Sequence, residues 1–97
     1  MQVIARRTLA EFWERHQQAE GPVRVWFAIV SKARWQTPND VKRQFGPTVD
    51  FVGDNRVIFD LGGNKYRLIA VLKYRWQIVY IRYILTHREY TREKWKP

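Results

Sequence analysis

The first half of the chain repeats its apolar residues at the spacing of a helix. One set begins at Leu9 and a second at Val23, and each follows one helical face at i+3, i+4 and i+7. Gly21-Pro22 separates the two sets, and proline is well tolerated in the first turn of a helix. We therefore expect two helices joined by a short break.

Capping signals and short apolar runs predict the elements around this pair. Val3-Ile4 suggests a short first strand. Thr8, with Glu11 three residues later, has the spacing of a capping box and predicts the start of the first helix. The segment 37–40 (Thr-Pro-Asn-Asp) predicts the start of a short third helix, which Gly46-Pro47 ends.

After residue 48 the pattern changes to the period of a strand. Segments 55–61, 65–74 and 76–86 are rich in Val, Ile, Tyr and Phe, and the turns between them lie at 62–64 and 73–75. This predicts a three-stranded antiparallel meander. The fold class is therefore α+β, with residues 1–97 in a single domain: 1–48 mostly helical, and 49–97 forming the meander and a basic C-terminal tail.

The two phases of the meander differ in character. One is almost entirely apolar and should pack on the helices; its members are Val57, Phe59, Leu61, Tyr66, Leu68, Ala70, Leu72, Val79, Ile81, Tyr83 and Leu85. The other places Arg56, Arg67 and Arg82 among aliphatic and aromatic residues. We expect that phase to form a half-covered basic concave face.

Charge is the strongest signal in the composition. Eighteen Lys and Arg against nine Asp and Glu give a net charge of +9, and ten of the basic residues but four of the acidic ones lie in 51–97. Such an excess attracts polyanions. Nucleic acid is the leading candidate partner, followed by an anionic membrane surface and an acidic protein, and the second half should make the contact.

The residue types that are missing narrow the chemistry. The chain has no cysteine, so disulfides and thiolate metal sites are excluded, which fits a cytoplasmic location. No stretch approaches the roughly 20 apolar residues that span a bilayer, and the start of the chain does not read as a signal peptide. His, Asp and Glu do not cluster at metal-ligand spacing, so we expect neither a metal nor a cofactor.

The motifs of the second half resemble those of HigB-type toxins in the RelE superfamily. Residues 53–59 and 62–68 are similar to their central hairpin, and residues 86–90 (Thr-His-Arg-Glu-Tyr) to their C-terminal Thr-His-x-Glu-Tyr signature. The opening, with 6–9 and 11–13, is similar too, so the resemblance covers almost the whole chain. Thr91 stands where relatives often carry Asp, so a role for that carboxylate is not carried over.

The resemblance implies a RelE-like fold in which two helices flank a twisted antiparallel sheet. It also implies an endoribonuclease that cleaves messenger RNA in the ribosomal A site and so arrests translation. The expected partner is an antitoxin of HigA type with a helix-turn-helix domain, and DNA would be contacted only through that complex.

Metal-free RNA cleavage needs a proton acceptor for the attacking 2′-hydroxyl and a donor for the leaving 5′-oxygen, each worth about 10²–10⁴-fold. Histidines titrate near pH 6.5, which suits this task. His87 is the one histidine of the basic half, because His16 belongs to an apolar helical stripe and reads as structural. By spacing alone His87 fits a surface position. The resemblance favours His87 as acid or base, with Tyr90 orienting it, stacking on a base or packing.

The basic residues of the meander are the candidates for holding phosphate. Arg56, Arg67 and Arg82 share one phase of three strands, and a guanidinium can bind two phosphate oxygens. We expect Arg67 to act with His87 and Tyr90 in catalysis, and Arg56 and Arg82 to bind RNA. Lys65 and Lys73, at the two turns, would extend this site; solvated arginines and edge-guarding lysines are the alternative.

Two other functions are compatible with the same pattern. One is a non-enzymatic toxin on this scaffold, such as a ParE-like inhibitor of DNA gyrase, for which a histidine beside clustered arginines would have no use. The other is a plain RNA-binding module, for which the basic face suffices.

Overall fold

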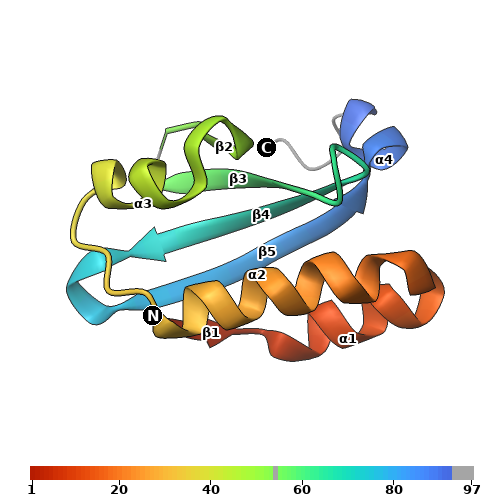
Figure 1. The fold of residues 1–97 in the computed structure, drawn as a ribbon, viewed down its shortest axis with the longest axis horizontal. Coiled ribbons are helices and arrows are strands. Elements are labelled where there is room, and N and C mark those ends of the chain that lie inside the picture. The colour runs from red at the N-terminus through yellow and green to blue at the C-terminus, as the bar shows by residue number, and fades with distance from the viewer. Residues whose placement is uncertain (54, 93–97) are drawn as a thin grey trace.

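The computed structural model describes residues 1–53 and 55–92, and its α+β architecture confirms the expected class. Five strands form one sheet in the order β1-β5-β4-β3-β2 (Figure 1). The strands are β1 (Gln2–Ile4), β2 (Val49–Phe51), β3 (Arg56–Leu61), β4 (Tyr66–Lys73) and β5 (Ile78–Thr86).

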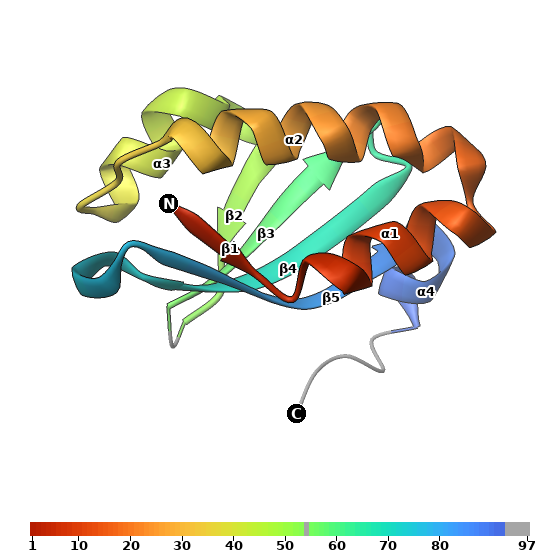
Figure 2. The same cartoon turned by 90° about the horizontal axis from the view of Figure 1, so that it is seen from below.

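Helices α1, α2 and α3 come before the meander, and a short helix follows it. Helix α1 and helix α2 lie on one side of the sheet, and the short α4 lies at the end of β5 (Figure 2). The helices are α1 (Arg6–Arg15), α2 (Glu20–Lys32), α3 (Pro38–Phe45) and α4 (His87–Thr91), with 3₁₀ turns η1 (Gln17–Ala19), η2 (Gly46–Thr48) and η3 (Tyr74–Trp76). The expected helix pair and short third helix are confirmed, whereas α4 was not predicted.

The two predicted helix starts of the first half have different outcomes. Helix α3 begins as expected: the Thr37 hydroxyl accepts a hydrogen bond from the Asp40 amide, and the Asp40 carboxylate accepts one from the Thr37 amide. The box proposed at Thr8 is wrong. The N-cap of helix α1 is Ala5, three residues before Thr8, and the left-handed backbone of Ala5 (φ 72°) turns the chain out of β1.

The sheet is mixed rather than purely antiparallel. Strands β3 to β5 pair antiparallel, as the meander predicts, and β2, which was not predicted, adds antiparallel to β3. Strand β1, in contrast, pairs parallel with β5, with Val3 opposite Val79. The expectation of an all-antiparallel sheet was therefore wrong at this one edge. Helices α1, α2 and α3 lie between β1 and the meander in sequence, and a connection of this length lets two strands pair in parallel.

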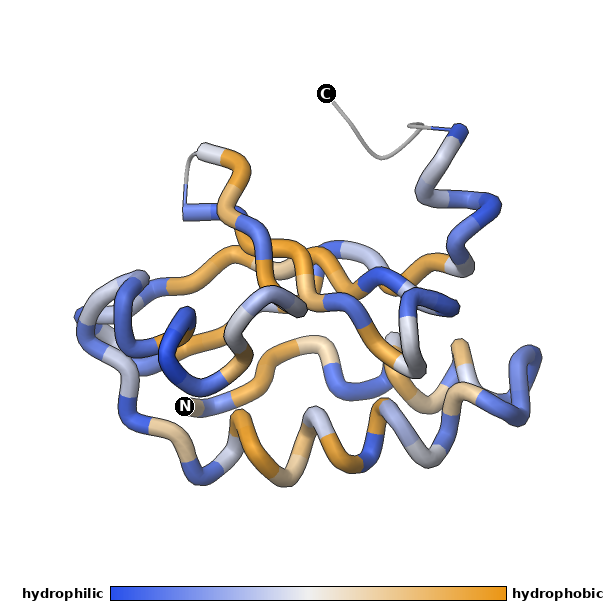
Figure 3. The backbone as a smooth tube through the Cα atoms, turned by 45° about the horizontal axis from the view of Figure 1, so that its top comes forward, coloured by the Kyte–Doolittle hydropathy of each residue, from blue (hydrophilic) through white to orange (hydrophobic). Residues whose placement is uncertain are grey.

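The main core lies between the helices and the apolar face of the sheet. Trp26 of α2 meets Phe59 of β3 edge to face, with ring centres 5.4 Å apart, and Phe45 of α3 approaches Phe59 from another side at 4.9 Å. Aromatic pairs in this geometry contribute about 0.5–1.5 kcal/mol beyond their buried area. Figure 3 shows the apolar stretches concentrated in the central strands and the hydrophilic ones in α4.

A bulge in β5 changes the predicted phases near its end. Ile69 pairs with Tyr83 but Ala70 pairs with Ile81, so Arg82 is an extra residue without a partner position. After the bulge, each residue of β5 points to the opposite face of the sheet from the one that simple alternation predicts. Ile84 joins the main core, whereas Tyr83 is partly exposed and Leu85 packs on the other face. The inward positions expected for Tyr83 and Leu85 are wrong for this reason.

A second, smaller cluster lies on the face of the sheet opposite the main core. Ile58 and Ile69 are buried there beneath Leu85 and Tyr90, so α4 covers one end of that face. This matches the half-covered basic face that the sequence predicts. Within the described residues, no helix has the length and apolar character to cross a bilayer. The basic tail beyond residue 92 lies outside them.

Candidate active site

A capping box fixes the start of α4 and with it the position of His87. The Thr86 amide donates to the Glu89 carboxylate at 2.9 Å, and the Glu89 amide donates to the Thr86 hydroxyl at 3.2 Å. This reciprocal arrangement satisfies amides that a helix start leaves unpaired. The chain therefore turns sharply at the end of β5, and His87 is the first residue of the helix, with an exposed side chain.

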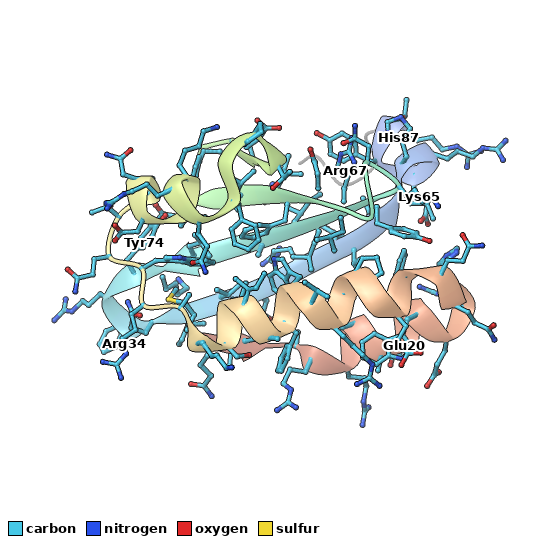
Figure 4. The ribbon with its side chains drawn as sticks, viewed as in Figure 1. Glu20, Arg34, Lys65, Arg67, Tyr74 and His87 are labelled. Carbon is cyan, nitrogen blue, oxygen red and sulfur yellow. The ribbon has the colours of Figure 1, made fainter. Side chains whose placement is uncertain are left out.

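His87 is also tied to the turn between β3 and β4. Its backbone amide donates to the Lys65 carbonyl at 2.9 Å, so the two residues lie side by side although 22 positions separate them. In Figure 4 the side chains of Lys65, Arg67 and His87 gather at one end of the molecule. We call Lys65, Arg67, His87 and Tyr90 the α4-end cluster.

Arg67 is the anchored cation of this cluster, only 9% exposed. Its Nε forms an ion pair with the Asp60 carboxylate on β3, with the two atoms 3.1 Å apart. Its Nη1 donates to the carbonyls of Asn64 and Tyr66 at 3.1 and 3.3 Å. These bonds hold the guanidinium in one orientation, which fits a preorganised positive charge better than a mobile arm reaching for phosphate.

Tyr90 covers this guanidinium. The Arg67 guanidinium carbon lies 5.3 Å from the centre of the Tyr90 ring, a distance typical of a cation–π contact. The ring also packs against the cluster of Ile58 and Ile69. Arg67 therefore connects β4 to α4, and Tyr90 is held in place on both sides.

The two carboxylates nearest to the cluster are shifted in opposite directions. Burial raises the pKa of Asp60 above its ordinary value, an effect that the Arg67 guanidinium opposes and the Asp50 carboxylate reinforces. The hydrogen bond from the Thr86 amide lowers the pKa of Glu89, which is further lowered by the positive fields of His16 and Arg15. Glu89 is therefore ionised in its capping role at neutral pH.

The end of α1 carries His16 and Arg15, the two residues whose charge acts on Glu89. His16 stacks on Phe12, with ring centres 4.6 Å apart, so it belongs to the packing of α1 as the sequence suggests. Arg15 is exposed and adds positive charge on this side of the cluster. Among the described residues, no group of three His, Asp or Glu is placed to hold a metal ion.

The structure does not bring the three strand arginines together. Arg67 lies opposite Asp60, whereas Arg56 is four positions away on β3, roughly 13 Å at strand spacing. Arg82 sits in the bulge, three residues before Leu85, the partner of Arg67, and its guanidinium lies 5.9 Å from the centre of the Tyr80 ring. The expectation that they converge on one phosphate was therefore wrong, because a shared phase does not mean a shared level along the strands.

Lys73 lies at the opposite end of β4 from the cluster, beside the second turn. It is exposed, and eight positions of strand separate it from Lys65. Of the proposed phosphate-binding residues, Lys65 is therefore adjacent to His87, Arg56 and Arg82 lie at intermediate levels of the same face, and Lys73 is remote.

Sequence reasoning missed three contributors to this site. Asp60 was not among the candidate residues, although its pairing with Arg67 follows once the hairpin register is known. Thr86 and Glu89 have the spacing of a capping box, a signal that is visible in the sequence but was not used to predict a helix there. All three residues act by positioning the α4-end cluster.

Comparison with known proteins identifies the family of the chain. The HigB_toxin family model, described as the RelE-like toxic component of a toxin–antitoxin system, matches residues 19–93. The chain is similar to the mRNA interferase toxin HigB of Escherichia coli K12, at 28% identity over 93% of this chain and 88% of that protein. Proteins named mRNA interferase HigB from Escherichia coli O157:H7 and Shigella flexneri match with the same identity and coverage. The helices, mixed sheet and α4-end cluster are thus those of a protein that belongs to the HigB_toxin family of RelE-like toxins.

Proposed function

We propose that this protein is an endoribonuclease that cleaves messenger RNA and thereby arrests translation. The observation that carries the proposal is the α4-end cluster, in which an exposed imidazole, a lysine and a locked guanidinium with its stacked tyrosine share one end of a basic face. Similar proteins that carry the name mRNA interferase support the same activity.

In the proposed reaction the 2′-hydroxyl of the RNA attacks the neighbouring phosphorus and the 5′-oxygen leaves. A proton moves from the 2′-oxygen to a base of the protein, and another moves from an acid to the 5′-oxygen. His87 is exposed at the mouth of the site and performs one of these transfers. The Lys65 ammonium and the Arg67 guanidinium stabilise the negative charge that develops on the phosphate oxygens.

The open part of the same sheet face offers a path for the RNA on either side of the scissile bond. Tyr80 and Tyr83 are about 40% exposed there, at 42% and 38%, and Arg82 is exposed between them. Unpaired bases commonly stack on aromatic side chains while arginines hold the phosphates. Arg56 lies on the same face, further from α4. Tyr90 is placed to orient the nucleotide nearest to His87.

The cellular setting follows from the family rather than from the site. We propose that the messenger is cut in the ribosomal A site in the cytoplasm, and that an antitoxin of HigA type silences the protein by forming a complex with it. DNA is contacted through the antitoxin in that complex. Membership of a family of toxic components supports an antitoxin partner, and the charge of +9 supports a polyanionic substrate.

The test is induced expression followed by mapping of the 5′ ends of cellular messages. We expect growth arrest and new internal cuts in translated messages with the wild-type protein. His87→Ala should abolish both while leaving the fold intact, because the side chain is exposed. In vitro, a message carrying a single 2′-deoxy nucleotide at a mapped cut should resist cleavage there. Cutting at the 2′-deoxy position would exclude the proposed reaction.

The ParE-like alternative is tested on the same preparations. A gyrase inhibitor would block DNA supercoiling by purified gyrase and would leave messages intact in cells. We expect no effect on supercoiling, and we expect His87→Ala to remove toxicity, which an inhibitor without proton-transfer chemistry has no reason to show.

A further inference from the structure

A large cavity lies far from the α4-end cluster. It measures about 1040 Å³ and is formed by three segments: residues 1–2, residues 31–36 at the end of α2 and just beyond it, and residues 74–77 around η3. In Figure 4 the labelled Tyr74 and Arg34 lie at this end, and Lys65 and His87 at the other. The length of β4 separates the two places, roughly 25 Å at strand spacing. We call this the η3 cleft.

The cleft has positive charge and an exposed aromatic ring. Lys32, Arg34 and Arg75 line it, and no carboxylate is present among the described lining residues. Trp76 is 64% exposed, the highest value among the large apolar side chains described. The Arg75 guanidinium lies 5.1 Å from the centre of the Trp76 ring. An indole with an arginine already on it offers a surface on which a base can stack.

The walls of the cleft are held in place by Gln77. Its side-chain Nε2 donates to the carbonyls of Trp35 at 2.6 Å and Tyr74 at 2.8 Å, and its own carbonyl accepts from the Gln2 amide at 2.7 Å. All three segments therefore meet at one residue. The position of Gln77 therefore fixes the relative placement of the segments that carry Trp76, Arg75 and Arg34.

From these features we infer that the η3 cleft is a second RNA-binding site, which holds one unpaired nucleotide away from the position of cleavage. The base stacks on Trp76, and the phosphates on either side contact Arg75, Arg34 and Lys32. Single-stranded RNA fits better than an acidic peptide, because an exposed tryptophan beside separate cations matches the alternation of base and phosphate. Such a site would add affinity and set the orientation of the protein on a large RNA.

The experiment measures binding with a probe that the protein cannot cut. A fluorescein-labelled, fully 2′-O-methylated single-stranded RNA lacks the attacking hydroxyl, so its anisotropy reports binding whether or not the proposed function is correct. We expect Trp76→Ala to weaken binding about fivefold or more, as for loss of one stacked base. Arg75→Glu should weaken it to a similar degree and flatten its salt dependence. The control Arg7→Glu makes the same change of charge on the exposed surface of α1 and should change affinity less than twofold.

A second measurement detects binding at Trp76 in protein of wild-type sequence. Protein labelled with 5-fluorotryptophan gives one ¹⁹F resonance for each tryptophan, and Trp76→Phe identifies that of Trp76. We expect this resonance to shift when the probe is added, while that of buried Trp26 stays in place. An unmoved Trp76 resonance at saturation, or equal losses in Arg75→Glu and Arg7→Glu, would overturn the proposal. So would variants that bind the probe normally but no longer bind purified antitoxin, since the cleft would then be a protein-docking surface.

Discussion

Arg67 lies between two groups that define its position: its Nε forms an ion pair with the Asp60 carboxylate at 3.1 Å, and its guanidinium carbon lies 5.3 Å from the centre of the Tyr90 ring. The first contact fixes the guanidinium to β3. The second transmits that position to α4, whose first residue is His87. The geometry of the proposed site therefore depends on a chain of contacts that runs from Asp60 through Arg67 to Tyr90.

The ring of Tyr90, rather than its hydroxyl, should be the part that holds α4 against the sheet. Tyr90→Phe keeps the cation–π contact and the packing on Ile58 and Ile69, and we expect it to retain most of the RNA-cutting rate. Tyr90→Ala removes both contacts and should lower that rate at least tenfold. Single-turnover cleavage on stalled ribosomes measures this. A Phe variant as slow as the Ala variant would instead assign the chemistry to the hydroxyl.

Asp60 should contribute to stability mainly by satisfying Arg67. Asp60→Ala leaves a nearly buried guanidinium without its carboxylate, and we expect the free energy of unfolding to fall by about 1–3 kcal/mol, less than for a fully buried pair. Asp60→Asn keeps an oxygen for the Arg67 Nε and should change it by less than about 1 kcal/mol. Urea unfolding followed by circular dichroism separates these outcomes.

The pH dependence of the Asp60 variants provides a control. Burial raises the pKa of Asp60, so ionisation of this carboxyl destabilises the folded state. Its favourable contribution is therefore complete below its unfolded pKa and declines as the pH rises through its folded pKa. Asp60→Asn should remove that decline. An identical pH profile for the wild type and Asp60→Asn would contradict the assignment.

The elements that were predicted from the sequence depend on local signals, whereas the elements that were missed depend on contacts between distant segments. The meander was predictable because alternation and the turn at 62–64 are local signals. The bulge at Arg82 was not, since period-two counting cannot register an inserted residue, and Tyr83 and Leu85 were assigned to the wrong face as a result. The parallel pairing of β1 with β5 joins two distant segments, so no pattern within a short stretch of sequence predicts it.

In the candidate site, too, the contacts between distant segments were the part that the sequence pattern did not predict. Lys65 and His87 are joined by a backbone hydrogen bond between a turn and a helix start, which their sequence neighbours do not reveal. The resemblance to HigB-type toxins pointed to His87, Tyr90 and Arg67 as one group, and the structure places them together with Lys65. Pattern alone had instead grouped Arg67 with Arg56 and Arg82, which lie at other levels of the sheet.

The cap of α4 should weaken in acid. Glu89 accepts a hydrogen bond from the Thr86 amide, and this bond lowers the pKa of Glu89 below its ordinary value of 4.5. A lowered folded pKa means that the stabilisation is present above the unfolded pKa and is lost as the pH falls through the folded one. We therefore expect amide exchange at Thr86 to accelerate relative to the core below about pH 4.5.

Glu89→Gln is the matched control for this effect. The amide oxygen of Gln can still accept from the Thr86 amide, but it does not titrate in this range, so the pH dependence should disappear while the cap remains at neutral pH. Glu89→Ala should expose the Thr86 amide at every pH. If Glu89→Gln were as acid-sensitive as the wild type, another carboxyl would be responsible.

Two lysines on the turns of the same sheet should differ in function although they carry the same charge. Lys65 is bonded through its carbonyl to the amide of His87, whereas Lys73 lies at the far end of β4. Lys65→Glu places a negative charge where charge develops on the phosphate, and we expect it to lower the cleavage rate at saturating message by about 10²-fold or more. Lys73→Glu should leave that rate within about twofold and weaken binding mainly at low salt, as loss of one distant phosphate contact does.

The comparison is informative because both variants change the net charge equally, so a general electrostatic role would affect them alike. Equal loss of rate at saturation in the two variants would move the reaction away from the α4-end cluster.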